Sequence, residues 1–233
     1  MNNAANSYEE GCVLLINKPM HWTSFDAVHK IRNTIRTKKV GHAGTLDPLA
    51  SGLLIICTGK FTKKINEYMA QEKEYTGTIT LGATTPTFDL ESEPQNFMSL
   101  TGLTEENIYE MLPSFTGEIL QVPPIHSAIK VNGKRVYKLA RKGDDVKLEP
   151  RKTTIKEFEI VKIEFPILSF RVVCSTGTYI RSLANDFGAA LGCGGYLSSL
   201  CRTRIGSYLL SDAVTIEEFV NAEKSKIERK INS

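Results

Sequence analysis

The sequence lacks the local motifs that usually mark a metal, nucleotide or membrane site. It has no Cys-x-x-Cys pair and no His-Glu-x-x-His run, and its four histidines never stand three or four residues apart. A structural zinc site is therefore not expected. Thr58-Gly59-Lys60 is followed by Phe61, and no glycine stands at position 54, which excludes a P-loop. No apolar run approaches the roughly 18 residues of a membrane span, and the polar first ten residues are unlike a secretory or mitochondrial leader.

Composition is that of an ordinary globular protein. The 233 residues are 41% hydrophobic and 24% charged, a balance that excludes a disordered or collagen-like chain. The length suits one large domain or two small ones. Five cysteines, an odd number without a leader, indicate reduced thiols and a cytoplasmic location.

Charge is segregated along the chain although the total is only +3. Residues 1–40 carry net +3, residues 41–129 net −7, residues 130–210 net +8 and residues 211–233 net −1. Two basic zones result: Lys30, Arg32, Arg36, Lys38 and Lys39, and Lys130, Lys134, Arg135, Lys138, Arg141 and Lys142. Each zone is either a solvated helix face or a contact surface for a polyanion.

Hydrophobic periodicity predicts intermixed strands and helices without strict alternation. We expect strands at 11–17, 53–57, 74–81, 155–165, 168–174 and 196–205, and helices at 24–36, 61–69, 104–113, 134–142, 178–191 and from 215. Ser24 and Thr178 are predicted helix caps. Asn132-Gly133 is typical of a type I′ turn, and Thr215-Ile-Glu-Glu218 of a capping box. The predicted fold class is α+β with a mixed, largely antiparallel sheet flanked by helices.

One glycine-rich segment stands apart, Gly41-His-Ala-Gly-Thr-Leu-Asp-Pro-Leu-Ala-Ser-Gly52, between a predicted basic helix and an apolar strand. Asp47 is its only acid. Such a carboxylate is either a turn aspartate bonded to its own backbone or a nucleophile or base on a loop held by buried elements. Local spacing does not choose between the two.

The same segment resembles the signature of bacterial tRNA pseudouridine-55 synthases of the TruB type. Four further blocks agree in order: Leu15-Ile-Asn-Lys-Pro19, Lys73-Glu-Tyr75, Gln121-Val-Pro-Pro-Ile-His-Ser-Ala-Ile-Lys-Val-Asn-Gly-Lys-Arg-Val-Tyr137 and Gly177-Thr-Tyr-Ile-Arg181. The resemblance covers about residues 11–218 and implies a single pseudouridine synthase domain over residues 1–233. Many relatives carry a C-terminal PUA domain. This chain ends about 15 residues after the capping box, so we expect none here.

The resemblance implies isomerisation of uridine 55 in the T-loop of tRNA to pseudouridine, with the target base flipped out of its stack. Nothing is added or removed, so no cofactor and no metal are expected. The expected partner is the T-arm stem-loop of tRNA, bound by a monomer without an obligate protein partner. Two alternatives remain at this point: a tRNA-folding chaperone without catalysis, and a synthase acting on guide-directed or ribosomal RNA.

Three residues match the family's catalytic positions. Asp47 matches the catalytic aspartate, which either attacks the nucleoside covalently or removes the C2′ proton to give a glycal. Arg181 matches the arginine that pairs with this aspartate, since an adjacent cation favours the ionised carboxylate. Tyr75 matches the tyrosine that stacks on the target base and is a candidate acceptor of the C5 proton.

Five further residues match substrate-binding positions. His42 matches the histidine that fills the space left by the flipped nucleotide, and Lys18 a pocket lysine with a binding or structural role. Tyr179 and Leu200 match positions lining the uracil pocket, although ordinary core packing accounts equally well for Leu200. Asp89 closes Thr-Pro-Thr-Phe-Asp, which resembles a loop that touches the T-loop RNA.

The second basic zone matches a segment that borders the bound stem-loop in the family. We therefore expect RNA backbone contacts from Lys134, Arg135, Lys138 and Arg141. Arg202 is predicted to contribute a further contact. The family often has Leu-Arg-Arg where this chain has Leu-Cys-Arg, so one basic contact is expected to be missing.

Overall fold

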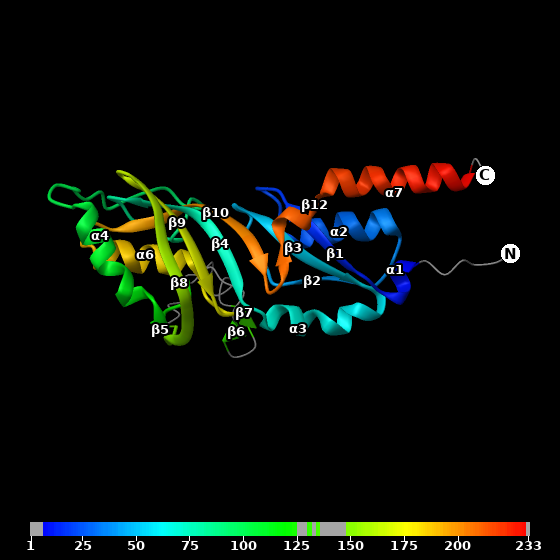
Figure 1. The fold of residues 1–233 in the computed structure, drawn as a ribbon, viewed down its shortest axis with the longest axis horizontal. Helices are drawn as coiled ribbons and strands as arrows, with labels where there is room; N and C mark the ends of the chain where they lie inside the picture. The colour runs from blue at the N-terminus through cyan, green and yellow to red at the C-terminus, as the bar shows by residue number, and fades with distance from the viewer. Residues whose placement is uncertain (1–6, 125–129, 132–133, 136–147, 232–233) are drawn as a thin grey trace. The chain divides into compact units, whose positions relative to one another are not determined.

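The computed structural model describes residues 7–124, 130–131, 134–135 and 148–231 (Figure 1). Contacts divide the chain into two compact units, one of Met1–Tyr75 with Cys201–Ser233 and one of Thr76–Leu200. They are called unit 1 and unit 2 below. The strands β4 (Lys73–Leu81) and β10 (Gly195–Ile205) run through both. The single domain over residues 1–233 stays a prediction.

Unit 1 is a sheet with helices on it. Its elements are α1 (Ser7–Glu10), β1 (Val13–Lys18), α2 (Ser24–Ile35), β2 (Val40–Ala43), β3 (Ala50–Thr58), the 3-10 helix η1 (Gly59–Lys64), α3 (Ile65–Ala70), β11 (Tyr208–Leu209), η3 (Leu210–Asp212), β12 (Val214–Thr215) and α7 (Ile216–Ile231). The strand order is β12-β1-β3-β10, with β2 also on β3. The pairs β1 with β3, β2 with β3 and β10 with β11 are antiparallel, whereas β1 and β12 are parallel.

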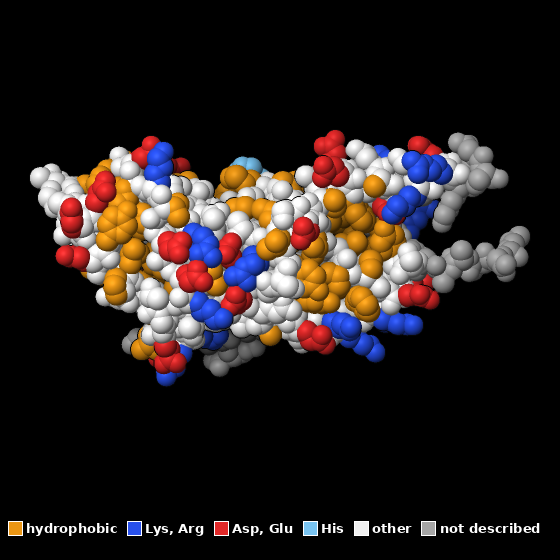
Figure 2. Space-filling model, in the orientation of Figure 1, with side chains coloured by type: hydrophobic (Ala, Val, Ile, Leu, Met, Phe, Trp, Pro, Cys, Tyr) orange, Lys and Arg blue, Asp and Glu red, His pale blue; other side chains and the backbone are white. Residues whose placement is uncertain are grey.

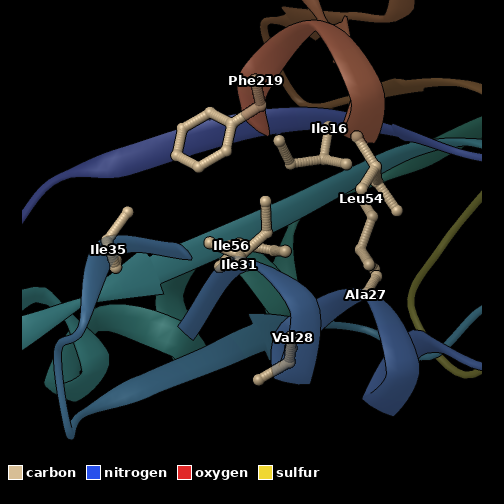
Figure 3. Packing of buried hydrophobic residues seen from close by; sticks show 9 residues of the cluster. Ile16, Ala27, Val28, Ile31, Ile35, Leu54, Ile56 and Phe219 are labelled. Carbon is tan, nitrogen blue, oxygen red and sulfur yellow. The ribbon is translucent and has the colours of Figure 1, made fainter. Parts of the chain in front are cut away.

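The apolar run of β3 is buried on both faces, which is why its sequence does not alternate. Leu54 and Ile56 pack with Ile31 of α2 and Phe219 of α7 in one core cluster (Figure 3). The odd positions of β3, including Ile55, face the opposite side and pack near η1 and α3. A central strand here was predicted, and the structure confirms it.

Unit 2 is an antiparallel sheet covered by α6. Its elements are α4 (Glu105–Met111), η2 (Leu112–Phe115), β5 (Gly117–Gln121), β6 (Lys130–Val131), β7 (Lys134–Arg135), β8 (Arg151–Glu164), β9 (Ile167–Cys174) and α6 (Ile180–Ala190). The strand order is β10-β4-β9-β8-β5, and β6 pairs separately with β7. Phe187 of α6 meets Phe158 of β8 and Phe115 edge to face, at ring distances of 5.3 Å. The α+β, largely antiparallel fold class is confirmed.

Two predicted helix caps are wrong. Thr23, not Ser24, caps α2, through a capping box with Asp26. Tyr179, not Thr178, is the N-cap of α6, because the Thr178 hydroxyl donates to the Ser175 carbonyl instead.

The predicted helix over 134–142 begins instead with the strand β7, and its remaining residues lie outside the described ones. The Asn132-Gly133 turn also lies outside them, although the register of Val131 opposite Lys134 is that of a two-residue connection. The capping box of Thr215 and Glu218 is confirmed.

Candidate active site

Asp47 lies on the loop between β2 and β3, and main-chain and side-chain bonds hold this loop on both sides. The buried Ser24 hydroxyl accepts from the Leu46 N–H (2.8 Å) and donates to the Leu46 carbonyl (3.1 Å). The His21 N–H donates to the Pro48 carbonyl (2.7 Å). After Asp47, the Ala50 N–H bonds to the main-chain oxygen of Asp47 (3.0 Å), so this turn does not require the carboxylate. Ser24 thus positions the loop instead of capping its helix.

Arg202 holds the same loop from β10, and it lies buried rather than at the surface where a contact with RNA was predicted. The residue is 1% exposed. Its guanidinium donates to the carbonyls of Leu53 (2.8 Å), Gly44 (3.2 Å) and Thr45 (3.5 Å). A cation buried in this way is satisfied by the protein and has almost no surface to offer a phosphate. Arg202 is a structural clamp on the loop of Asp47.

Lys18, at the end of β1, is also buried in unit 1 and is 0% exposed. Its ammonium donates to the carbonyls of Pro19 (2.9 Å) and Trp22 (2.7 Å). Burial lowers the pKa of Lys18 to about 8; the nearby Arg202 charge lowers it too, while Asp47 raises it. The structural role left open for Lys18 is therefore present, together with an electrostatic link to Asp47.

His42 and Tyr75 belong to unit 1 as well. His42 is half-buried on β2, and burial lowers its pKa, so its imidazole is neutral at pH 7. A neutral aromatic ring suits the predicted role of His42, which is to fill the space that the flipped nucleotide leaves. Tyr75 is buried on β4, a position compatible with both a core residue and a base-stacking residue.

In unit 2, Arg181 stands in the first turn of α6 and forms an ion pair with Asp89 (3.5 Å). Their side chains are only 5% and 6% exposed. The other Asp89 carboxylate oxygen accepts from the Glu91 N–H (3.0 Å). A buried carboxylate that accepts these bonds holds the guanidinium in one place. The pairing of Arg181 with Asp47 and the contact of Asp89 with RNA both stay predictions.

The start of α6 is held by a residue that the sequence analysis did not single out. Gln121, the last residue of β5, is 3% exposed. Its side-chain oxygen accepts from the Tyr179 N–H (2.8 Å), and its side-chain nitrogen donates to the Tyr179 carbonyl (2.9 Å). Next to it, the Ser182 hydroxyl donates to the Val122 carbonyl (2.8 Å). The only sign of Gln121 in the sequence was its position as the first residue of the Gln-Val-Pro-Pro block.

The remaining predicted residues are less constrained. Leu200 is half-buried on β10. The side chains of Lys134 and Arg135, and the whole of Lys138 and Arg141, lie outside the described part of the chain. Within that part, no group of three or more His, Cys, Asp or Glu side chains could hold a metal ion. No helix described there is long and apolar enough to cross a membrane.

Comparison with known proteins identifies the family. Residues 32–180 match the model of the TruB family pseudouridylate synthase (N terminal domain), and residues 181–231 that of the tRNA pseudouridylate synthase B C-terminal domain. The tRNA pseudouridine synthase B of Flavobacterium johnsoniae is 54% identical over 91% of this chain and 96% of its own length. That of Chlorobaculum tepidum is 48% identical over 91% of both chains.

A solved structure agrees with the fold. A chain in the crystal structure of a Cbf5-Nop10-Gar1 complex matches with a TM-score of 0.72 and 30% identity, over 92% of this chain. This chain spans about half of that chain, 54%. The chain belongs to the TruB family of pseudouridylate synthases, and the family resemblance read from the five sequence blocks is confirmed.

Proposed function

We propose that this chain converts uridine 55 in the T-loop of tRNA to pseudouridine, acting as a monomer in the cytoplasm. The observation that carries the proposal is the loop of Asp47, whose main chain is held by Ser24 at Leu46 and by Arg202 at Gly44. Close relatives with nearly the same length are tRNA pseudouridine synthases. Preorganised loops of this kind suit covalent or acid–base chemistry.

The reaction balances without any added group. The bond from C1′ of the ribose to N1 of uracil breaks, the base turns, and a bond from C1′ to C5 forms. The C5 proton leaves and N1 gains a proton. Asp47 either bonds to the sugar carbon or removes the C2′ proton, and in both routes the step requires its ionised form.

The other residues have supporting roles. Arg181 keeps Asp47 ionised, and Asp89 holds Arg181. Tyr75 stacks on the uracil and accepts the C5 proton, while Tyr179 and Leu200 line the base pocket. His42 takes the space of the flipped nucleotide and offsets part of the few kcal/mol that flipping costs. Lys18 supports the loop of Asp47.

Tritium release from C5-labelled uridine in a tRNA transcript tests the proposal. Wild-type protein is expected to release tritium, and Asp47→Asn only background, because the amide can neither attack nor accept a proton. Urea unfolding of the nearly isosteric variant checks its fold. Equal release by both proteins would refute the catalytic role of Asp47, and mapping of the modified nucleotide tests position 55.

A further inference from the structure

The first basic zone of the sequence has no part in the site described above. In the structure it surrounds the end of α2, where Arg32, Asn33, Arg36, Thr37 and Lys38 line a hollow of about 560 Å³ in unit 1. We call these five residues the α2-end cluster. The hollow is large enough for one or two phosphate groups with their water, and three of its five lining residues are cationic.

Among the described residues, no ion pair involves Arg32, Arg36 or Lys38, and the sequence has no acid between Val28 and Val40.

The cations of β8 and β9 in unit 2 differ from those of the α2-end cluster because they form ion pairs. Arg171 is paired there with Glu157 (2.6 Å), and Lys162 with Glu164 (2.8 Å). Figure 2 shows Lys or Arg and Asp or Glu side chains interleaved over these strands. Among the described residues, no carboxylate therefore pairs with the cations around the end of α2.

The backbone of the cluster is fixed in an uncommon conformation. Arg36, the C-cap of α2, has a φ of 54°, the left-handed region that helix ends usually fill with glycine. A side chain in that region is strained. The buried Thr37 hydroxyl donates to the Ile35 carbonyl (3.4 Å) and anchors the turn. An arginine is thus held where glycine would be less strained, and the chain turns so that Lys38 lines the same hollow as Arg32.

A purely structural explanation covers only part of this arrangement. One cation in the last turn of a helix is stabilised by the helix dipole. Arg32 fills that role by itself. The dipole effect falls off within the last turn, so it does not account for Lys38, and it does not compensate the strain at Arg36.

We propose that the α2-end cluster binds backbone phosphates of the RNA substrate, as a second contact outside the T-loop site. Arginine forks match phosphate oxygens in pairs, and the Asn33 amide adds a neutral donor. A single free anion would gain little here, because Arg36 and Lys38 are exposed and the buried Thr37 hydroxyl already donates to the Ile35 carbonyl. A polyanion presents several phosphates together and releases counterions on binding. The inference rests on the proposed function, since it takes tRNA as that polyanion.

The test measures the affinity for a full-length tRNA transcript as a function of salt. The variant is Arg32→Gln with Lys38→Gln, which leaves the strained Arg36 in place. In a plot of the logarithm of the binding constant against the logarithm of the salt concentration, the loss of two phosphate contacts should make the slope shallower by about 1.4 to 1.8. At 0.1 M salt this corresponds to roughly a 25- to 60-fold loss of affinity. The turnover rate at saturating tRNA should not change, because neither residue belongs to the catalytic machinery.

Two control variants make the result specific. Arg32→Lys with Lys38→Arg keeps both charges and should keep the slope. Lys60→Gln with Lys63→Gln removes two exposed charges from η1 of the same unit and should leave the slope within a few tenths of wild type. Urea unfolding checks that all three variants are folded.

An unchanged slope for the Arg32 and Lys38 variant would overturn the inference. An equal change of slope in the Lys60 and Lys63 variant would also overturn the inference, because the change would then reflect the total charge of the protein and not a contact at the α2-end cluster. Tritium release separates this outcome from failure of the proposed function. Release by wild type with an unchanged slope refutes only the second contact, whereas absence of release from labelled tRNA refutes the proposed function.

Discussion

Gln121 forms its side-chain hydrogen bonds with the main chain of Tyr179, and its loss should impair catalysis through that residue. In Gln121→Leu the Tyr179 N–H loses an acceptor at 2.8 Å, which costs about 1–3 kcal/mol for a buried donor. The Tyr179 carbonyl loses a donor at 2.9 Å but keeps the helical bond from Leu183 (3.0 Å), which limits that loss to about 1 kcal/mol. The free energy of unfolding should fall by about 2–4 kcal/mol.

The kcat of Gln121→Leu should fall by more than its loss of folding stability explains. Tyr179 and Arg181 share the first turn of α6, and a displacement of about 1 Å there can lower the rate on the order of 100-fold. Tritium release at saturating tRNA, measured well below the unfolding midpoint, gives kcat. Ser182→Ala, which removes a neighbouring bond to Val122 (2.8 Å), is the matched control, expected to cost about 1 kcal/mol of stability with little change in kcat.

Gln121→Glu adds a pH test that a purely structural role would not show. The substituted carboxyl can donate to the Tyr179 carbonyl only when protonated, and burial favours its protonated form. Its activity relative to wild type should therefore rise as pH falls, whereas the relative activity of Gln121→Leu should not vary with pH. If Gln121→Leu is destabilised but keeps the wild-type kcat, the positioning role is refuted.

Three other outcomes follow from the geometry. Arg202→Leu should destabilise the protein by about 3 kcal/mol in urea unfolding, because three main-chain carbonyls lose a charged donor; a loss below 0.5 kcal/mol would contradict the clamp. Lys18 has a pKa lowered to about 8, so between pH 8 and its ordinary value near 10.5 the unfolded chain binds more protons than the folded one. Wild type should therefore gain stability relative to Lys18→Met as pH rises through that window; a flat or falling difference in unfolding free energy would contradict the lowered pKa. Lys138→Ala with Arg141→Ala should flatten the salt dependence of T-arm minihelix binding by roughly one unit per lost phosphate contact, and an unchanged slope would remove these residues from the RNA interface.

Local sequence patterns were enough to predict much of the secondary structure and to identify the family. The short apolar run over Leu53–Cys57, bounded by Gly52 and Gly59, predicted a central strand, and the structure has β3 there. The capping box at Thr215 was also readable, since both its bonds join residues three apart. The loop of Asp47 was identified from its glycines and single acid, and the family from five ordered blocks.

The partners of polar side chains were decided only by the tertiary structure. Ser24 has the chemistry of a helix cap, but folding brings Leu46 against it and Thr23 caps the helix instead. Arg202 was predicted at the RNA surface, although its guanidinium lies among the carbonyls of a loop some 150 residues earlier in the chain. Gln121 meets Tyr179 across a separation of 58 residues. Periodicity reports which residues are buried, whereas a hydrogen-bond partner depends on which strands and loops the whole fold brings together.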